Sequence, residues 1–402
     1  MKRQIRRLFF VALLLCLSTA AQAQGLLNRG KASLAFVDKA HYVSAALQRD
    51  DYLPLLAGKR VGVVANQTSV VGNTHLVDTL LSLGADVRKI FTPEHGFRGI
   101  ADAGAHVTHG QDEKTGLPIV SLYGKNKKPT PEMLRDIDLI LFDLQDVGVR
   151  FYTYISTMSY VMEAAAENGI PIIVLDRPNP NGFYVDGPVL KTENQSFVGM
   201  HPVPVVYGMT IGEYAKMVNG EGWLKNGVAC ELTVIPIINY NRNAIYELPV
   251  RPSPNLPNWE SVYLYPTLCF FEGSFVSVGR GTETPFQVYG HPKLRGSHGF
   301  TPHSTAGASK PLHEGKRCRG ENLVAFAHDY ANNSNRLHLE WIIEAYLQLK
   351  DTGFFKDYFR LLAGDGQLRR DMERGKSADD IRASWQDDLD AFKAIRAKYL
   401  MY

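Results

Sequence analysis

The sequence predicts an α/β protein, in which a Rossmann-like parallel sheet with helices on both faces precedes a smaller α+β C-terminal domain. Two observations lead to this prediction. Between residues 60 and 238, short and continuously apolar runs alternate with amphipathic stretches, as is typical of parallel strands buried on both faces. A proline-rich stretch at 248–266 then ends the alternation and predicts a rigid connector. We therefore expect one large domain over residues 24–262 and a second over residues 263–402 that completes a cleft.

The expected elements of the large domain alternate between strands and helices. The apolar runs predict strands at residues 61–65, 86–91, 117–123, 138–143, 171–176 and 230–237. The amphipathic stretches predict helices at residues 74–83, 153–168 and 210–219. Gly169 is expected to close the second of these helices, because glycine readily adopts the left-handed conformation found at helix ends.

The second domain shows weaker patterns. Residues 268–278 are apolar and predict a strand, whereas residues 296–320 are polar and glycine-rich and predict a long loop. Three further stretches predict helices at 321–330, 340–350 and 384–399. The whole chain of 402 residues is 45% hydrophobic and 21% charged, which excludes collagen-like, disordered and coiled-coil proteins.

The first 23 residues are expected to form a secretory signal peptide. A basic start is followed by an apolar run at 9–17 and by the small-x-small sequence Ala21-Gln22-Ala23, which predicts cleavage after Ala23. The apolar run is too short to span a bilayer. Cys16 raises a lipoprotein alternative, which is less favoured because Leu15 precedes it where such signals usually have a small residue. We therefore expect a periplasmic or secreted protein with no membrane span.

The net charge of +3 depends on this first segment. Without its four cations the chain carries 40 Lys and Arg against 41 Asp and Glu, so the mature protein is nearly neutral. Such a balance provides no electrostatic footprint for nucleic acid or an anionic membrane, and we expect neither as a partner. Cys230, Cys269 and Cys318 have no metal-like spacing and predict free or buried thiols. Nothing in the sequence indicates an oligomeric state.

Polar side chains follow four of the predicted strands at the point where each strand ends. In an open parallel sheet, ligands bind outside the carboxyl ends of the strands. These ends carry Asn66, then Glu94, His95 and Arg98, then Asp143, Gln145, Asp146, Arg150 and Tyr152, and finally Asp176, Arg177 and Asn179. Each residue alone could equally cap a turn or form an internal ion pair. As a set they predict a cleft whose carboxylates, amides, arginines and aromatic rings suit a carbohydrate.

Several other chemistries lack their motifs. No G-x-G-x-x-G follows the first strand and no Walker A sequence is present, which disfavours a dinucleotide or nucleoside triphosphate enzyme. No G-x-S-x-G elbow is present, which disfavours an α/β-hydrolase triad. A histidine and aspartate cluster lies after the second strand, but its spacing matches no strong ligand motif, so we expect no metal and no cofactor; its members are His95, Asp102, His106, His109 and Asp112.

Five motifs follow one another over most of the chain. They are Pro-Glu-His-Gly-Phe-Arg-Gly at 93–99, Phe-Asp-Leu-Gln-Asp-Val-Gly-Val-Arg-Phe-Tyr-Thr at 142–153, Leu-Asp-Arg-Pro-Asn-Pro-Asn-Gly at 175–182, Arg-Pro-Ser-Pro-Asn-Leu-Pro at 251–257 and Phe-Glu-Gly-Ser-Phe-Val-Ser-Val-Gly-Arg-Gly-Thr at 271–282. In this order they resemble the NamZ family of secreted or lipid-anchored exo-β-N-acetylmuramidases, from about residue 59 to the C-terminus. Ser274 departs from the threonine expected in relatives, and it keeps the hydroxyl.

The resemblance implies an active site between the two domains that releases terminal N-acetylmuramic acid (MurNAc) from the non-reducing end of peptidoglycan fragments such as MurNAc-GlcNAc. It places Glu94 in the catalytic motif, and we assign Glu94 as the general acid. Glycoside cleavage usually needs a second group as well. Asp143, Asp146 and Glu272 are the candidates, although Glu272 could instead form an interdomain ion pair with Arg280.

Two features of MurNAc guide the remaining expectations. Its lactyl carboxylate favours an arginine partner, and the candidates are Arg98, Arg150, Arg177, Arg251 and Arg280. Its 2-acetamido group could act as an internal nucleophile, and direct attack by water is the other route. Tyrosines at 152, 154, 207 and 289 could stack on sugar rings. Two other functions stay open: a non-catalytic muropeptide-binding protein and a metal-dependent cell-wall amidase.

Overall fold

The fold was analysed in a computed structural model, which describes residues 42–94, 96–97, 110–244, 246–333 and 335–402. The expected signal peptide therefore lies outside the described residues. So do His95 and Arg98, and so do three members of the histidine and aspartate cluster, at positions 102, 106 and 109.

A seven-stranded sheet forms the centre of the N-terminal part. Its strands are β1 (Val61–Ala65), β4 (Val87–Thr92), β5 (Gly110–Gln111), β6 (Pro118–Ser121), β7 (Leu139–Asp143), β8 (Ile172–Leu175) and β9 (Leu232–Ile235). Their order is β5-β6-β4-β1-β7-β8-β9, and every pair is parallel except β5 with β6. The chain moves outward from β1 on one side and then resumes on the other, which is the Rossmann-like arrangement that the sequence predicts.

Helices cover both faces of this sheet. They include α2 (Arg49–Leu56), α3 (Leu76–Ser82), α4 (Pro131–Leu134), α5 (Tyr154–Asn168) and α6 (Ile211–Gly220). Alternate residues of β7 point to opposite faces: Ile140 and Phe142 join the core that contains α5 and α6, whereas Leu139 and Leu141 join the core that contains α2 and α3. Burial on both faces explains why the central strands β1, β7 and β8 are almost continuously apolar.

Local signals set the ends of two of these helices. Thr210 begins α6 with a capping box, in which its side chain accepts from the backbone N–H of Glu213 and the Glu213 carboxylate accepts from the backbone N–H of Thr210. Gly169 ends α5 in the left-handed conformation at φ 63°, as its sequence position predicts.

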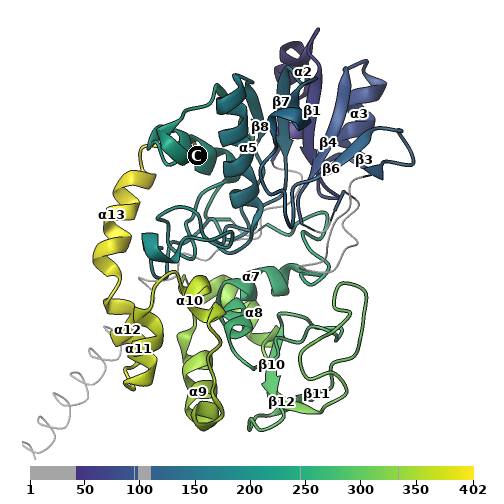
Figure 1. Cartoon of the computed structure of the whole chain (residues 1–402). Coiled ribbons are helices and arrows are strands. Elements are labelled where there is room, and N and C mark those ends of the chain that lie inside the picture. Colours follow the sequence, from purple (N-terminus) through teal and green to yellow (C-terminus); the bar gives the residue numbers. More distant parts are fainter. Residues whose placement is uncertain (1–41, 95, 98–109, 245, 334) are drawn as a thin grey trace, which may run out of the picture.

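The C-terminal part combines a small antiparallel sheet with helices. The sheet has the order β10-β12-β11, with β10 (Val288–His291), β11 (His298–Phe300) and β12 (Cys318–Asn322). The helices are α7 (Trp259–Leu268), the 3-10 helix η5 (Cys269–Gly273), α8 (Val324–Asn333), α9 (Leu339–Leu349), α10 (Tyr358–Ala363), α11 (Gln367–Glu373), α12 (Ala378–Ala383) and α13 (Gln386–Arg396). Figure 1 shows α7 between the two lobes and α13 running from the lower lobe back to the upper one.

Shorter elements complete the fold. They are the hairpin of β2 (Val70–Val71) with β3 (Thr74–His75) and the 3-10 helices η2 (Ala45–Leu47), η3 (Thr192–Asn194), η4 (Lys225–Gly227) and η6 (Lys350–Thr352). Among the described residues, no helix has both the length and the apolar character needed to cross a bilayer.

Three expectations for the second half are wrong. The end of the proline-rich stretch is helical, because Asn258 and Ser261 form a capping box that begins α7. Pro266 lies inside this helix without an N–H to donate, and the side-chain amide of Asn181 donates to the carbonyl oxygen of Val262 at 3.2 Å in its place. Residues 268–278 contain η5 rather than a strand, and the expected loop at 296–320 contains β11 and the start of β12.

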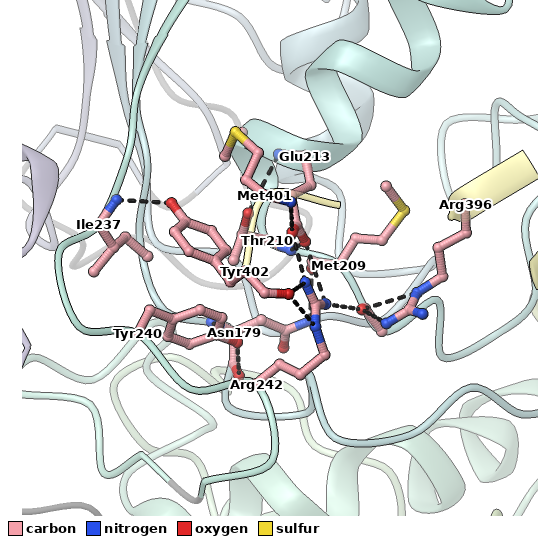
Figure 2. Close-up of polar contacts among 12 residues, drawn as sticks. Asn179, Met209, Thr210, Glu213, Ile237, Tyr240, Arg242, Arg396, Met401 and Tyr402 are labelled. Atoms are coloured by element: carbon pink, nitrogen blue, oxygen red, sulfur yellow. Dashed lines mark hydrogen bonds and ion pairs between the residues drawn. The ribbon is translucent and has the colours of Figure 1, made fainter. Parts of the chain in front are cut away.

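The last two residues of the chain fasten α13 to the large domain (Figure 2). The Tyr402 hydroxyl donates to Asp176 at 2.8 Å and accepts from the backbone N–H of Ile237 at 2.7 Å. Arg242 donates to the Tyr402 carbonyl oxygen at 2.9 Å and also forms an ion pair with the buried Glu213. One polar network therefore ties the C-terminal residue to segments around β8, α6 and β9.

We expect Tyr402→Phe to lower the free energy of unfolding by about 1–3 kcal/mol, because it leaves a backbone N–H and a buried carboxylate oxygen without this partner. Urea denaturation would measure the change. Tyr399→Phe is the matched control, because the Tyr399 hydroxyl bonds a partly exposed Glu221 and its loss should cost under about 1 kcal/mol. Equal losses in the two variants would contradict this role of Tyr402.

Candidate active site

A cavity of about 350 Å³ lies where the two lobes meet, and we call it the interlobe cavity. The N-terminal part contributes residues that follow β4, β6 and β7, and the C-terminal part contributes α7, η5, α10 and the loop before β10. Its lining is Glu94, Tyr123, Phe151, Tyr152, Thr153, Tyr154, Phe197, Val198, Ser253, Leu256, Tyr265, Cys269, Glu272, Arg280, Phe286, Tyr358 and Leu362. The residues that the sheet contributes all follow the carboxyl ends of its strands. This is the edge at which open parallel sheets bind ligands.

Glu94 enters the cavity from the carboxyl end of β4. The Thr153 hydroxyl donates to one of its carboxylate oxygens at 3.1 Å. The Tyr123 hydroxyl is hydrogen-bonded to the Glu94 carboxylate. Burial and the negative charge of Glu94 raise the pKa of this hydroxyl. Hydroxyl groups from two strand-end loops therefore orient this carboxyl group.

Glu272 enters the same cavity from the opposite lobe, on η5. The Arg280 guanidinium donates to one carboxylate oxygen at 2.8 Å, and the Cys269 sulfur lies 3.5 Å from the other. Burial raises the pKa of the Cys269 thiol well above its ordinary value, so the sulfur stays protonated and can donate. Both oxygens of Glu272 are thus held in place by neighbours on its own lobe.

Aromatic rings form much of the remaining wall. Tyr265 on α7 contacts Phe151 edge-on at 5.5 Å and Tyr152 at 6.0 Å between ring centroids. The Tyr152 hydroxyl donates to the carbonyl oxygen of Pro252 at 2.7 Å. Rings fixed in this way offer apolar faces that can pack on a ligand without a large loss of side-chain entropy.

Of the residues that the sequence analysis proposed for the site, the structure brings five to this cavity: Glu94, Glu272, Tyr152, Tyr154 and Arg280. The expectation that Asp143 and Arg150 share a cavity with Glu94 is wrong, because neither belongs to the lining formed by the described residues. Asp146 is absent from this lining too, so Glu272, which comes from the other lobe, is the one carboxylate besides Glu94 among the described lining residues.

Asp143 and Arg177 pair with each other in the interior. The guanidinium donates to both carboxylate oxygens, with 2.7 Å between Nη2 and Oδ2, and both side chains are buried. A bidentate pair of this kind occupies the guanidinium donors and the carboxylate oxygens that a sugar would need. The two residues connect the ends of β7 and β8 and are not exposed to the cavity.

Arg150 is completely buried and bonds only backbone oxygens among the described residues. Its terminal nitrogens donate to the carbonyl oxygens of Pro188, Val203, Leu362 and Ala363 at 2.7–2.8 Å. Burial lowers the pKa of this guanidinium to about 10. Because its acceptors belong to both lobes, Arg150 joins the lobes.

The other strand-end residues hold loops together. The Asp176 carboxylate accepts from Thr210 and Gly212 at the start of α6 as well as from Tyr402. The Gln145 amide donates to the carbonyl oxygens of Asp146 and Pro178, and the Asn179 amide to that of Met209. Asn66 is buried behind the cavity wall, where its amide donates to the Tyr154 hydroxyl at 2.8 Å.

Arg251 is exposed and lines a separate, smaller cavity. Tyr207 and Tyr289 are buried outside the interlobe lining: the Tyr207 hydroxyl donates to Asp146, and Tyr289 stacks on Phe271 at 4.8 Å. Within the described part of the chain, no three His, Cys, Asp or Glu side chains are grouped as metal ligands. Cys230, Cys269 and Cys318 are free and buried, as expected.

Sequence reasoning missed six of the eight aromatic residues in the described lining, namely Tyr123, Phe151, Phe197, Tyr265, Phe286 and Tyr358. Tyr123 is the last residue of the third predicted strand, and the strand-end rule was applied only to four of the five other predicted strands. Phe286, Tyr265 and Tyr358 gave no such signal, because they come from irregular or helical segments of the second lobe that only folding brings to the cavity.

Asp146 gives a prediction for the dependence of stability on pH. Burial raises the pKa of its carboxyl group from 3.8 to about 6. Between these values the native protein holds more protons than the unfolded chain, so the free energy of unfolding falls as pH rises through this window. In Asp146→Asn, which keeps an acceptor for the backbone N–H of Gly148, we expect this fall to disappear. Across this pH window, the difference in the free energy of unfolding between Asp146→Asn and wild type should change by about 3 kcal/mol.

Urea denaturation at several pH values between 4 and 7 would measure this difference. Asp390→Asn is the control, because Asp390 is exposed and pairs with Lys393 at the surface. Parallel pH profiles for wild type and Asp146→Asn would contradict the prediction.

Two glutamates from opposite lobes and a ring of aromatic side chains around one cavity are the features of an α/β enzyme that cleaves carbohydrates. The comparisons with known proteins identify the family. The chain belongs to the NamZ family: residues 61–260 match its N-terminal domain, described as exo-beta-N-acetylmuramidase NamZ, and residues 263–402 match the C-terminal domain of the same description. The protein is therefore a glycoside hydrolase, which confirms the resemblance seen in the sequence.

Individual relatives agree with this assignment. The chain is 40% identical over 384 residues to the peptidoglycan beta-N-acetylmuramidase NamZ of Bacillus subtilis, covering 88% of this chain and 89% of that protein. Crystal structures of two DUF1343 family proteins from Bacteroides fragilis are also similar. One is 45% identical with a TM-score of 0.82, covering 90% of this chain and 99% of the other. The second is 30% identical with a TM-score of 0.78, covering 91% and 100%.

Proposed function

We propose that this protein is an exo-β-N-acetylmuramidase that hydrolyses terminal MurNAc from the non-reducing end of peptidoglycan fragments such as MurNAc-GlcNAc. The observation that carries the proposal is the shared cavity of Glu94 and Glu272 at the lobe interface. Its volume of about 350 Å³ suits one sugar residue with its substituents. The activity named for the Bacillus subtilis relative supports the same substrate class.

Glu94 is the general acid in this proposal. It protonates the glycosidic oxygen as the bond to MurNAc breaks, and the Thr153 hydroxyl orients its carboxyl group. Glu272 is the second carboxylate. It either activates the attacking water or orients the 2-acetamido group of MurNAc. The anomer of MurNAc that is released first distinguishes these routes. Direct attack by water inverts the anomeric centre, whereas participation of the acetamido group retains its configuration.

Arg280 is the proposed partner of the lactyl carboxylate. It is the one arginine among the described lining residues, and the hydrogen bond to Glu272 uses only its Nε. The two terminal nitrogens of the guanidinium therefore remain as donors, and their planar arrangement matches a carboxylate. The stacking of Arg280 on Phe286 at 5.0 Å fixes the plane of the guanidinium.

The test is to incubate the purified protein with MurNAc-GlcNAc and a metal chelator and to quantify free MurNAc and GlcNAc by chromatography. Stoichiometric release of both sugars in the presence of the chelator is the expected result. Binding of the disaccharide without turnover would replace the proposal by a muropeptide-binding protein. Chelator-sensitive release of peptide from muropeptides, with the sugars left intact, would replace it by a metal-dependent amidase.

Export across the cytoplasmic membrane is part of the proposal, because peptidoglycan lies outside it. We expect residues 1–23 to be removed, so that the mature protein begins at Gln24. N-terminal sequencing of the protein recovered from the periplasmic or secreted fraction would check this. A lipid-modified Cys16 at the N-terminus would instead establish the lipoprotein alternative.

A further inference from the structure

A second cavity of about 330 Å³ lies beside the first, and we call it the lateral cavity. Segments around α5, η3, the start of η4 and the loop between β6 and α4 form it, so it belongs to the N-terminal lobe alone. Its lining is Lys127, Tyr160, Glu163, Gln195, Ser196, Phe197, Met200, His201, Trp223 and Lys225. Phe197 also lines the interlobe cavity, and the other nine side chains have no part in the proposed reaction.

The lateral cavity is built around two pairs of nearly parallel rings. Trp223 and His201 lie 25° from parallel with centroids 5.8 Å apart, and Tyr160 and Phe197 lie 13° from parallel with centroids 6.2 Å apart. Burial lowers the pKa of His201 to about 4, so its ring is neutral at ordinary pH. His201 is buried and supports Trp223 from behind, whereas Tyr160, Phe197 and Trp223 are partly exposed. The uncharged faces of these three rings suit the C–H surface of a sugar better than a charged ligand.

Phe197 connects the two cavities. It lies in the tight turn bridged by Ser196 and Gly199, and it lines both cavities. Its ring contacts Tyr123 on the interlobe side at 6.1 Å and Tyr160 on the lateral side at 6.2 Å. The two cavities therefore adjoin at Phe197.

The polar groups of the lateral cavity also suit a glycan. Lys127 lies over the Phe197 ring at 4.6 Å, and Lys225 is exposed at the rim. Glu163 is occupied internally, because it accepts from Lys128 and from the backbone N–H of Lys225. Two ammonium groups beside neutral rings match a chain of sugars in which every second unit carries a carboxylate.

We propose that the lateral cavity is a second sugar-binding subsite, which holds a residue of the glycan on the leaving-group side of the bond that is cleaved. The proposal rests on the proposed muramidase function and adds the preference for longer glycans. A glycan repeats units of similar size, and the two adjoining cavities have nearly equal volumes of about 350 and 330 Å³. Terminal MurNAc occupies the interlobe cavity while a later sugar stacks on the lateral rings.

The experiment compares two substrates. One is the 4-nitrophenyl glycoside of MurNAc, which ends at the leaving group, and the other is a peptide-free tetrasaccharide of two MurNAc-GlcNAc units. Two variants alter the lateral cavity: Trp223→Ala removes a ring, and Gln195→Trp fills the space from an exposed position. Gln386→Trp adds the same bulk on exposed α13 and serves as the matched control.

The measured quantity is kcat/KM for the tetrasaccharide divided by kcat/KM for the aryl glycoside. In both lateral variants we expect this quotient to fall about tenfold, mainly because KM for the tetrasaccharide rises. A subsite remote from the reacting bond contributes equally to binding of the ground state and the transition state, so its loss raises KM. The control should keep the wild-type ratio. A ratio within twofold of wild type in both folded lateral variants overturns the proposal. A third substrate, the same tetrasaccharide with stem peptides, gives a second test. A loss confined to this third substrate overturns the proposal as well, because the lateral cavity would then bind peptide.

A binding measurement separates this inference from the proposed function. Calorimetric titration of Glu94→Gln with the tetrasaccharide should show an affinity about tenfold higher than that of the double variant Glu94→Gln, Gln195→Trp. If the wild-type protein hydrolyses neither substrate, the proposed function fails, and this titration still decides whether the lateral cavity binds sugar. Equal affinities would reject the subsite.

Discussion

Replacement of Glu94 by Gln should lower kcat for MurNAc-GlcNAc by about 10²–10⁴-fold, the usual contribution of a general acid. The amide has nearly the same shape and still accepts from the Thr153 hydroxyl, so the fold and KM should stay near wild type. Steady-state kinetics and thermal unfolding would measure both. Glu132→Gln is the control, because Glu132 is exposed and pairs only with Arg135 at the surface in the described structure.

The leaving group makes this test specific for an acid. A 4-nitrophenolate leaves without needing a proton, whereas the GlcNAc oxygen needs one. The loss in Glu94→Gln should therefore be much smaller for the aryl glycoside than for the disaccharide. Glu272→Gln should instead impair both substrates alike, because its proposed role is on the attacking side. Equal losses for both substrates in Glu94→Gln, or near-normal rates, would reject Glu94 as the acid.

Replacement of Arg150 by Met should destabilise the protein by about 4 kcal/mol or more. It keeps most of the side-chain volume but leaves four buried carbonyl oxygens without their charged donor. Two of these oxygens belong to α10 and two to the N-terminal lobe, so the interface that shapes the interlobe cavity should loosen as well. Urea denaturation would give the free energy, and turnover in native buffer would report the cavity.

Arg135→Met is the matched control for Arg150, because the Arg135 side chain is 73% exposed and its loss should cost under about 1 kcal/mol. Arg150→Lys should recover only part of the stability, because an ammonium group cannot reproduce the planar arrangement of the guanidinium donors. A change below about 1 kcal/mol in Arg150→Met would show that the four carbonyl contacts contribute little.

The strands of the large domain were predictable because burial on both faces forces a continuous apolar run. The run at 61–65 corresponds to β1 residue for residue, and that at 138–143 differs from β7 by a single residue. The stretch at 268–278 shows the opposite case. It is apolar because η5 and the following loop are buried between helices, and a short apolar run does not distinguish a strand from another buried segment.

The site was predictable only in part, because polar residues at strand ends serve two purposes that look alike in sequence. Glu94 and Asp143 both follow buried strands, yet Glu94 lines the interlobe cavity while Asp143 is sealed by Arg177. The loops after β7 and β8 fold over the sheet edge and bury their own polar groups, which must then be hydrogen-bonded internally. The path of those loops cannot be read from the residues at their first positions.

The sequence by itself determined the layered sheet, its strand positions and the presence of Glu94 at its functional edge, because these follow from local periodicity and from the chemistry of strand ends. The tertiary structure decided which carboxylate and which arginine share the interlobe cavity with Glu94 and which arginine joins the lobes. Those outcomes depend on contacts between residues far apart in the chain. Glu272 reaches the cavity only because α7 and η5 pack beneath the sheet, and Arg150 is withdrawn from it because α10 presents carbonyl oxygens that only a buried guanidinium can satisfy.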